Sequence, residues 1–122
     1  MEDRLIGFSI RIVNLGCKLQ AVSELAPSCH HILRSGLSSA MYYGDAVNLS
    51  SLPDLTKKLH SVLAELRKIQ LWLELFGSDF QLPFQQEIEG LREENAELIA
   101  LILKETGSVR KKLKPEIAGK DQ

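Results

Sequence analysis

The segment from Ser51 to Gly77 constrains the fold most, because its apolar residues recur at alternating spacings of four and three. The residues that carry this rhythm are Leu55, Leu59, Val62, Leu66, Ile69, Leu73 and Phe76. Such spacing places them on one face of an α-helix. Ser51 is a suitable N-cap, and Asp54 in the first turn complements the positive end of the helix dipole. Gly77 is predicted to end the helix in the left-handed conformation that glycine favours.

The beginning of the chain carries two apolar stripes with helical spacing. The first stripe is made of Leu5, Phe8, Ile12, Leu15 and Leu19. The second, on an adjacent face, is made of Ile6, Ile10, Val13 and Cys17. Two stripes form a wider apolar surface than one partner helix can cover. The segment is therefore predicted to be a helix, and its excess apolar surface points to an oligomer.

The last helical segment is expected to start near Phe84 and to weaken at Gly107. Its apolar face is formed by Phe84, Ile88, Leu91, Leu98 and Ile102, and Asn95 interrupts that face. Asn95 is either a buried residue that fixes the register of packed helices or a partly exposed residue near one end of a bundle. Beyond Gly107 the chain is charged and contains Pro115. We therefore expect a bundle domain over residues 1–108 and a basic, flexible tail over residues 109–122.

The stretch "HILRSGLSSAMYYGDAVN", residues 30–47, is rich in glycine and serine but is also predicted to be helical. A loop here would leave a long unstructured connection inside a small domain, which is uncommon. As part of a helix over residues 28–49, its small residues allow a neighbouring helix to approach closely. Strand-like alternation is absent from the sequence. Four helices with short connections predict an all-α fold, an antiparallel up-down four-helix bundle.

Composition limits the class of protein. The chain has 122 residues, enough for one domain, and its 44% hydrophobic and 25% charged residues are typical of a globular protein. A net charge of −1 gives no bulk attraction to nucleic acid or to a membrane surface. The N-terminus lacks the features of a signal peptide, and no apolar run is long enough to span a bilayer. With only Cys17 and Cys29, both expected to be reduced, a cytoplasmic location is the expectation.

Two stretches of the sequence resemble the motifs of a known family. "LRSGLSSAMYYGDA" is similar to L-R-S-G-T-S-[IV]-G-A-N-Y-x-E-A, and "SLPDLTKKLHSVLAELRKIQLWLELF" is similar to S-x-x-D-F-x-x-K-L-x-x-A-L-x-E-A-x-E-T-x-Y-W-L-E-L-L. Both motifs are typical of the four-helix-bundle proteins first noticed as products of intervening sequences in bacterial 23S ribosomal RNA genes. The matching positions are Leu33, Arg34, Ser35, Gly36, Ser38, Ala46, Asp54, Lys58, Leu59, Leu63, Glu65, Trp72, Leu73, Glu74 and Leu75.

The resemblance, which extends over about residues 5–106, implies a four-helix protomer that assembles with itself into a homopentamer. The family also includes the accessory protein of diversity-generating retroelements, a basic barrel that binds nucleic acid and the reverse transcriptase. This chain departs from the family pattern at Tyr42, Gly44 and Asp45, and it is nearly neutral. Two hypotheses follow: a non-enzymatic homo-oligomeric scaffold or binding protein, or a nucleic-acid-binding accessory protein that binds RNA or DNA.

No motif for catalysis or for a cofactor is present. The sequence lacks the nucleophile elbow G-x-S-x-G, the phosphate-binding G-x-x-x-x-G-K-[ST] and the dinucleotide-binding G-x-G-x-x-G. His30 and His31 are adjacent, so on a helix they point about 100° apart and do not face one metal ion easily, while His60 lies on another helix. We therefore expect no catalytic residue, no cofactor, no metal and no small-molecule substrate.

The remaining candidates for functional residues form three groups. Arg34, Asp45 and Glu65 are predicted to form a polar cluster, either a charged set that fixes helix register or a recognition site. Gly36, Ala40 and Trp72 are candidates for a subunit interface. Five basic residues with only Glu105 among them give a local charge of +4 and are candidates for nucleic-acid contact. They are Lys104, Arg110, Lys111, Lys112 and Lys114.

Overall fold

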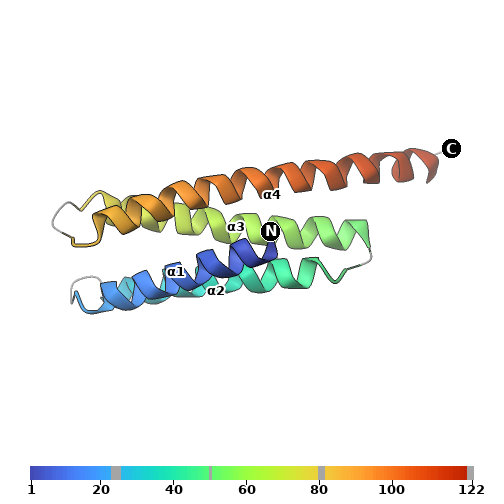
Figure 1. Ribbon diagram of the computed structural model, residues 1–122. Coiled ribbons are helices and arrows are strands. Elements are labelled where there is room, and N and C mark those ends of the chain that lie inside the picture. The colour runs from blue at the N-terminus through green and yellow to red at the C-terminus, as the bar shows by residue number, and fades with distance from the viewer. Residues whose placement is uncertain (23–25, 50, 80–81, 121–122) are drawn as a thin grey trace.

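The chain folds into four α-helices joined by short connections (Figure 1). A computed structural model describes residues 1–22, 26–49, 51–79 and 82–120, with side chains described as far as residue 113. The helices are α1 (Glu2–Gln20), α2 (Ala26–Ala46), α3 (Leu52–Gly77) and α4 (Gln85–Lys120). No strand occurs in these ranges. The predicted all-α class is therefore confirmed.

Consecutive helices run in opposite directions and pack side by side, which makes an up-down four-helix bundle (Figure 1). The pairs α1–α2, α2–α3 and α3–α4 pack closely, whereas the closing pair α1–α4 makes far fewer contacts. In Figure 1 the N-terminus lies part-way along the bundle, and the C-terminal end of α4 extends past the other helices. None of the helices in the described ranges is both long enough and apolar enough to cross a membrane.

The core is built from the helix faces that the periodicity predicts. All five residues of the first stripe of α1 are buried, and so are the apolar residues of α3 from Leu59 to Phe76 that follow the alternating spacing. The contribution of α4 comes from Ile88, Leu91, Leu98 and Ile102. Burial of this apolar surface stabilises the bundle, because most of the stability of helices in proteins comes from the packing of their apolar faces.

The small residues of α2 allow α1 and α2 to pack closely. A Cβ atom on Gly36 would lie 2.8 Å from Cγ2 of Ile12, and one on Gly16 would lie 2.6 Å from Cδ2 of Leu33. The hydroxyl of Ser9 crosses the same contact and donates a hydrogen bond of 2.7 Å to the carbonyl oxygen of Gly36. The prediction of a helix that tolerates close approach is confirmed.

The ends of α3 agree only in part with the sequence analysis. Ser51 is the N-cap, and its hydroxyl accepts a hydrogen bond of 3.5 Å from the backbone N–H of Asp54. The prediction for Gly77 is wrong: it is the last helical residue and does not have a positive φ. The cap is Ser78, with φ −80°, whose hydroxyl donates to the carbonyl of Leu75 at 2.7 Å. A serine side chain thus satisfies one of the terminal carbonyl groups. In a cap with a left-handed glycine, backbone N–H groups would do so instead.

Beyond residue 108, where a basic tail is expected, the chain continues as part of α4. Helix α4 passes Gly107 without a break and continues to Lys120, so the basic segment is helical. Val109 is only 6% exposed because it packs on the bundle, and the hydroxyl of Thr106 donates to the carbonyl of Ile102. The core therefore extends at least one residue beyond the predicted end of the domain.

Candidate functional site

A groove with a volume of 470 Å³ lies between α2 and α3, and we call it the α2–α3 groove. Helix α2 contributes His31, Arg34, Ser35, Ser38 and Tyr42. Helix α3 contributes Glu65, Lys68 and Trp72. Apart from the adjacent pair Arg34 and Ser35, these residues recur at spacings of three or four along each helix, so each set forms a single face. Cavities that bind small ligands in proteins have volumes of roughly 300–1,000 Å³.

One end of the α2–α3 groove is aromatic. The imidazole of His31 stacks on the indole of Trp72, with ring centroids 5.5 Å apart and an interplanar angle of 4°. Behind this pair, Trp72 also stacks on Phe76 at 5.9 Å, and the ring of His31 contacts that of His30 at 4.0 Å with a tilt of 37°; His31 and Trp72 are the two of these rings that line the groove. Four rings from two helices therefore form one continuous aromatic wall. Stacked and offset ring pairs of this kind are stabilising beyond the area that they bury.

The middle of the groove is charged. Nζ of Lys68 lies 3.1 Å from Oε1 of Glu65, whose side chain is only 13% exposed. The guanidinium of Arg34 has no hydrogen bond or ion pair with any residue in the described ranges. Two of the three residues of the predicted polar cluster, Arg34 and Glu65, thus line one groove.

The third residue of that predicted cluster, Asp45, is separate from the other two. Its Oδ2 lies 3.4 Å from Nζ of Lys58, and its side chain is 60% exposed. Asp45 lies eleven positions after Arg34 on the helix, which corresponds to about 16 Å along the axis. A single three-residue cluster is therefore not formed. The partner of Asp45 follows from the antiparallel register of α2 and α3, which the sequence does not show.

The predicted interface residues have different environments. Gly36 is buried against α1 within the protomer, so its surface is not available to a second subunit. Trp72 is half-buried in the aromatic wall. Ala40 is half-buried and lines an apolar groove of 300 Å³ between α1 and α2.

That second groove, which we call the α1–α2 apolar groove, is flanked by large exposed side chains. Ile6 and Ile10 of α1 are 43% and 56% exposed, and Leu37 and Met41 of α2 are 53% and 69% exposed. The second stripe of the first helix is thus uncovered in the protomer, as its spacing predicted. A separate pair, Leu71 and Leu75, is exposed one turn apart on α3. Contiguous exposed apolar surface is typical of interaction sites.

The basic residues near the C-terminus lie on α4. Lys104, Arg110, Lys111 and Lys112 are exposed, and the side chain of Lys114 lies outside the described part of the chain. Nη2 of Arg110 is 3.0 Å from Nε2 of His60 on α3. Because a guanidinium can only donate, Nε2 of His60 is the acceptor in this contact.

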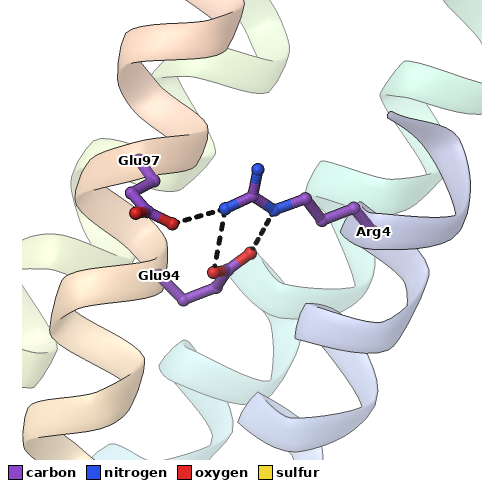
Figure 2. A network of polar contacts seen from close by, with 3 residues as sticks. All are labelled: Arg4, Glu94 and Glu97. Carbon is purple, nitrogen blue, oxygen red and sulfur yellow. Dashed lines mark hydrogen bonds and ion pairs between the residues drawn. The ribbon is translucent and has the colours of Figure 1, made fainter.

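A network of charges closes the seam between α1 and α4 (Figure 2). The guanidinium of Arg4 donates to both oxygens of Glu94, at 2.6 and 3.0 Å, and also to Glu97. The hydrogen bond from Arg4 is the main cause that lowers the pKa of Glu94. The seam also includes an ion pair of 2.9 Å between Lys18 and Glu87. The sequence analysis missed these pairs, since they join residues 69 to 93 positions apart.

The sequence analysis also missed the polar contact of a buried tyrosine. The hydroxyl of Tyr43 on α2 lies 3.1 Å from both carboxylate oxygens of Glu105 on α4. Burial, together with the charge of Glu105, raises the pKa of Tyr43 to about 12. The partner of Tyr43 lies 62 positions away along the chain, so local spacing gives no indication of it.

Metal-binding residues are not gathered in the described ranges, where no group of three or more His, Cys, Asp or Glu side chains could hold an ion. Cys17 is exposed and Cys29 is buried, and no disulfide joins them. Burial raises the pKa of the Cys29 thiol, which favours the neutral form.

Comparison with known proteins identifies one similar solved structure. A protein of unknown function of the S23 ribosomal protein family from Bacteroides thetaiotaomicron is 27% identical, with a TM-score of 0.79. The alignment covers 86% of this chain and 96% of that chain. The likeness supports a related family and the four-helix fold. No family model matches the chain. No curated protein matches it.

Several positions that carry the sequence resemblance lie together in the structure. Arg34, Ser35 and Ser38 of the first motif and Glu65 and Trp72 of the second all line the α2–α3 groove. The two motifs therefore meet across the α2–α3 contact. Their shared surface is a groove with polar and aromatic lining.

Proposed function

We propose that the protein is a non-enzymatic, homo-oligomeric four-helix-bundle scaffold or binding module of the cytoplasm. The observation that carries this proposal is the α1–α2 apolar groove with its four exposed side chains, Ile6, Ile10, Leu37 and Met41. Leaving such a surface in water is unfavourable, by roughly 25 cal/mol for each Å² that a partner could cover. A second copy of the chain is the partner most readily available to cover this groove, because it is present at the protein's own concentration.

The exposed pair Leu71 and Leu75 favours a ring over a simple dimer. When the apolar groove of one protomer meets a different surface of the next, the contact is heterologous and generates a closed ring or a filament. A homopentamer, which the family resemblance implies, is a ring of this kind. The similar solved structure has no assigned function, so the number of subunits is part of the proposal.

The test is the mass of the protein in solution at micromolar concentration, measured by light scattering after size-exclusion chromatography. We expect the mass of several chains, and five by the resemblance. Ile10→Glu places a charge in the apolar groove and is expected to lower the mass, whereas Leu103→Glu, at a residue of α4 that is 45% exposed, is the matched control. A native mass of one chain would contradict the proposal, as would equal behaviour of the two variants.

A second candidate function is binding of RNA or DNA. It is favoured by four described cations towards the C-terminal end of α4, Lys104, Arg110, Lys111 and Lys112, which are all exposed. The C-terminal end of the same helix extends past the rest of the bundle (Figure 1). In a homo-oligomer these charges would be repeated in each subunit, and release of counterions from phosphates would make the affinity fall with salt.

The second candidate is tested by titrating labelled structured RNA and duplex DNA at about 50 and 200 mM salt. We expect salt-sensitive binding that is lost in the triple variant Arg110→Gln, Lys111→Gln, Lys112→Gln. The charge-matched control is Lys18→Gln, Arg67→Gln, Arg92→Gln, which removes three cations from α1, α3 and α4 elsewhere. Equal losses in both triple variants would indicate a non-specific effect of net charge.

A further inference from the structure

We propose that the α2–α3 groove is a binding site for a small ligand that combines a phosphate monoester with a planar ring, the chemistry of a nucleoside monophosphate. The proposal concerns a different surface from the α1–α2 apolar groove and from the basic end of α4. It rests on hydrogen-bond donors without partners, on the net charge of the groove and on the aromatic wall at one end.

The donors of the groove differ from most comparable groups elsewhere in the described helices. Seven other serine and threonine hydroxyls donate to backbone carbonyls; they belong to Ser9, Ser39, Thr56, Ser61, Ser78, Thr106 and Ser108. The hydroxyls of Ser35 and Ser38 make no hydrogen bond to a described residue, and neither does the indole N–H of Trp72. Polar groups in and near the core normally find partners, so a row of free donors is unusual.

These donors are open to solvent. In the described part of the chain, the carbonyl oxygen of the Asn95 side chain is the one fully buried side-chain polar atom without a partner. The unpartnered atoms of Ser35, Ser38 and Trp72 are therefore accessible from the groove that their residues line. Accessible donors of this kind can hydrogen-bond to water, and a ligand rich in acceptors can replace that water.

The charge of the groove selects an anion. Arg34 and Lys68 carry positive charges, and Glu65 carries the only formal negative charge, so the lining has a net charge of +1 with neutral His31. Lys68 is held by Glu65 at 3.1 Å, which leaves Arg34 as the cation without a partner. A guanidinium offers two parallel N–H groups that match two oxygens of a phosphate.

The aromatic wall and the length of the groove select a ligand with a planar ring. His31 and Trp72 are stacked at the end of the groove, one turn of α2 from Arg34. Tyr42 lies eleven positions after His31 on α2, so the lining extends about 16 Å along the helix. A bare phosphate would occupy only the region around Arg34, whereas a ring joined to it could also lie against the wall. Stacking of a base on an aromatic side chain contributes about 1–3 kcal/mol in other proteins.

The experiment uses Trp72, the only tryptophan of the chain, as the reporter of its own groove. The full-length protein is titrated with each of the four common ribonucleoside 5′-monophosphates, with excitation near the red edge of indole absorption, and calorimetry supplies an independent affinity. We expect a saturable change in emission. The monophosphate is expected to bind at least about tenfold more tightly than either the nucleoside or inorganic phosphate, because only it uses both ends of the groove.

The decisive variant is Arg34→Gln, which is expected to weaken binding about tenfold or more by removing a charged hydrogen bond. The control is Arg67→Gln, an exposed arginine of α3 that does not line the groove. Far-ultraviolet circular dichroism and solution mass are recorded on the same samples. Loss of ligand binding is therefore distinguishable from loss of folding or of assembly.

Two results would overturn the proposal: no saturable signal with any of the four monophosphates up to about 10 mM, or equal weakening by Arg34→Gln and Arg67→Gln. A 5′-phosphorylated trinucleotide separates two sources of the same chemistry. If it binds as tightly as the best monophosphate, the site takes the end of a nucleic acid chain. If it binds more weakly, the site takes the free nucleotide.

Discussion

At the scale of single residues, two buried polar side chains connect α4 to other helices. Nδ2 of Asn95 donates to the backbone carbonyl of Leu66 on α3 at 3.0 Å, and the residue is only 1% exposed. This geometry decides between the two interpretations of Asn95 in favour of the buried residue. Tyr43 makes the other connection, to the carboxylate of Glu105. Both contacts depend on the axial position of α4, so they favour one register of the bundle.

Replacing Asn95 by leucine is expected to leave stability unchanged or to raise it by about 1–2 kcal/mol, because the variant removes an unpartnered buried oxygen. Urea unfolding monitored by circular dichroism measures the difference. A loss of more than about 1 kcal/mol would show instead that this oxygen has a hydrogen-bonding partner such as an ordered water.

Tyr43 is expected to make stability sensitive to alkaline pH. Its pKa is raised to about 12 in the folded protein, against about 10 in an unfolded chain. The unfolded state therefore loses its proton first, so the stabilising contribution is complete below pH 10 and is lost as the pH rises through 12. Tyr43→Phe is expected to be less stable by about 1 kcal/mol at pH 8, and the difference should shrink between pH 10 and 12. A constant difference over that range would exclude the linkage.

At the scale of helices, the pairs of neighbours are held in different ways. Close packing of small residues joins α1 to α2, as the contacts of Gly16 and Gly36 show. The contact between α1 and α4 is sparse and depends on exposed ion pairs such as those of Arg4 (Figure 2). Exposed ion pairs stabilise weakly, so α1 is attached to the bundle mainly through α2.

Gly36 and Gly107 provide a matched pair of glycines inside helices. A methyl group on Gly36 would meet Ile12 at 2.8 Å, whereas a methyl group on Gly107 would meet nothing within 4 Å. Gly36→Ala is therefore expected to destabilise by about 1–3 kcal/mol through overpacking. Gly107→Ala is expected to stabilise by up to about 1 kcal/mol through helix propensity. Thermal unfolding of both variants checks the signs, and a stabilised Gly36→Ala would mean that α1 and α2 separate easily.

The Arg4–Glu94 pair is expected to make the α1–α4 seam sensitive to acid. The pKa of Glu94 is lowered in the folded state by the hydrogen bond from Arg4, so the pair stabilises above the unfolded pKa and this effect is lost as the pH falls. Arg4→Met should therefore have a lower melting temperature than the native protein at pH 7, and the two should converge near pH 3. Arg4→Met also removes the hydrogen bond from Arg4 to Glu97. Glu94→Gln is therefore needed as a second variant, because it keeps that bond and changes only the Arg4–Glu94 pair.

At the scale of the whole molecule, the bundle and the C-terminal segment form one continuous structure. Val109 is buried and Arg110 contacts His60, so residues beyond 108 take part in packing against α3. The basic residues are thus presented on a helix that begins inside the bundle. In an assembly of several chains, the distances between these basic residues would therefore be set by the positions of the bundles.

Two truncated chains test whether residues after 106 contribute to stability by packing on the bundle. A chain ending at residue 113 is expected to keep native stability, because Val109 and Arg110 remain. A chain ending at residue 106 should be less stable by about 1.5–3 kcal/mol, the value of burying one valine side chain. Denaturant unfolding measures both. Equal stability of the two chains would place the end of the domain where the sequence analysis expected it.

The sequence by itself determined the class of fold, the four helices and most of the core. These features depend on which apolar residues share a helical face, and that periodicity is local in the chain. Leu5 to Leu19 on α1 and Leu59 to Phe76 on α3 are buried as their spacing predicts. The second stripe of α1, with the exposed residues Ile6 and Ile10, could be predicted from its spacing in the same way.

Only the tertiary structure decided which residues meet. It brought Arg34 and Glu65 into one α2–α3 groove, paired Asp45 with Lys58, and buried Gly36 within the protomer. It also stacked His31 on Trp72. Each of these contacts depends on the axial register and rotation of one helix against another. Register is set jointly by packing along the whole bundle, so no single stretch of sequence contains it.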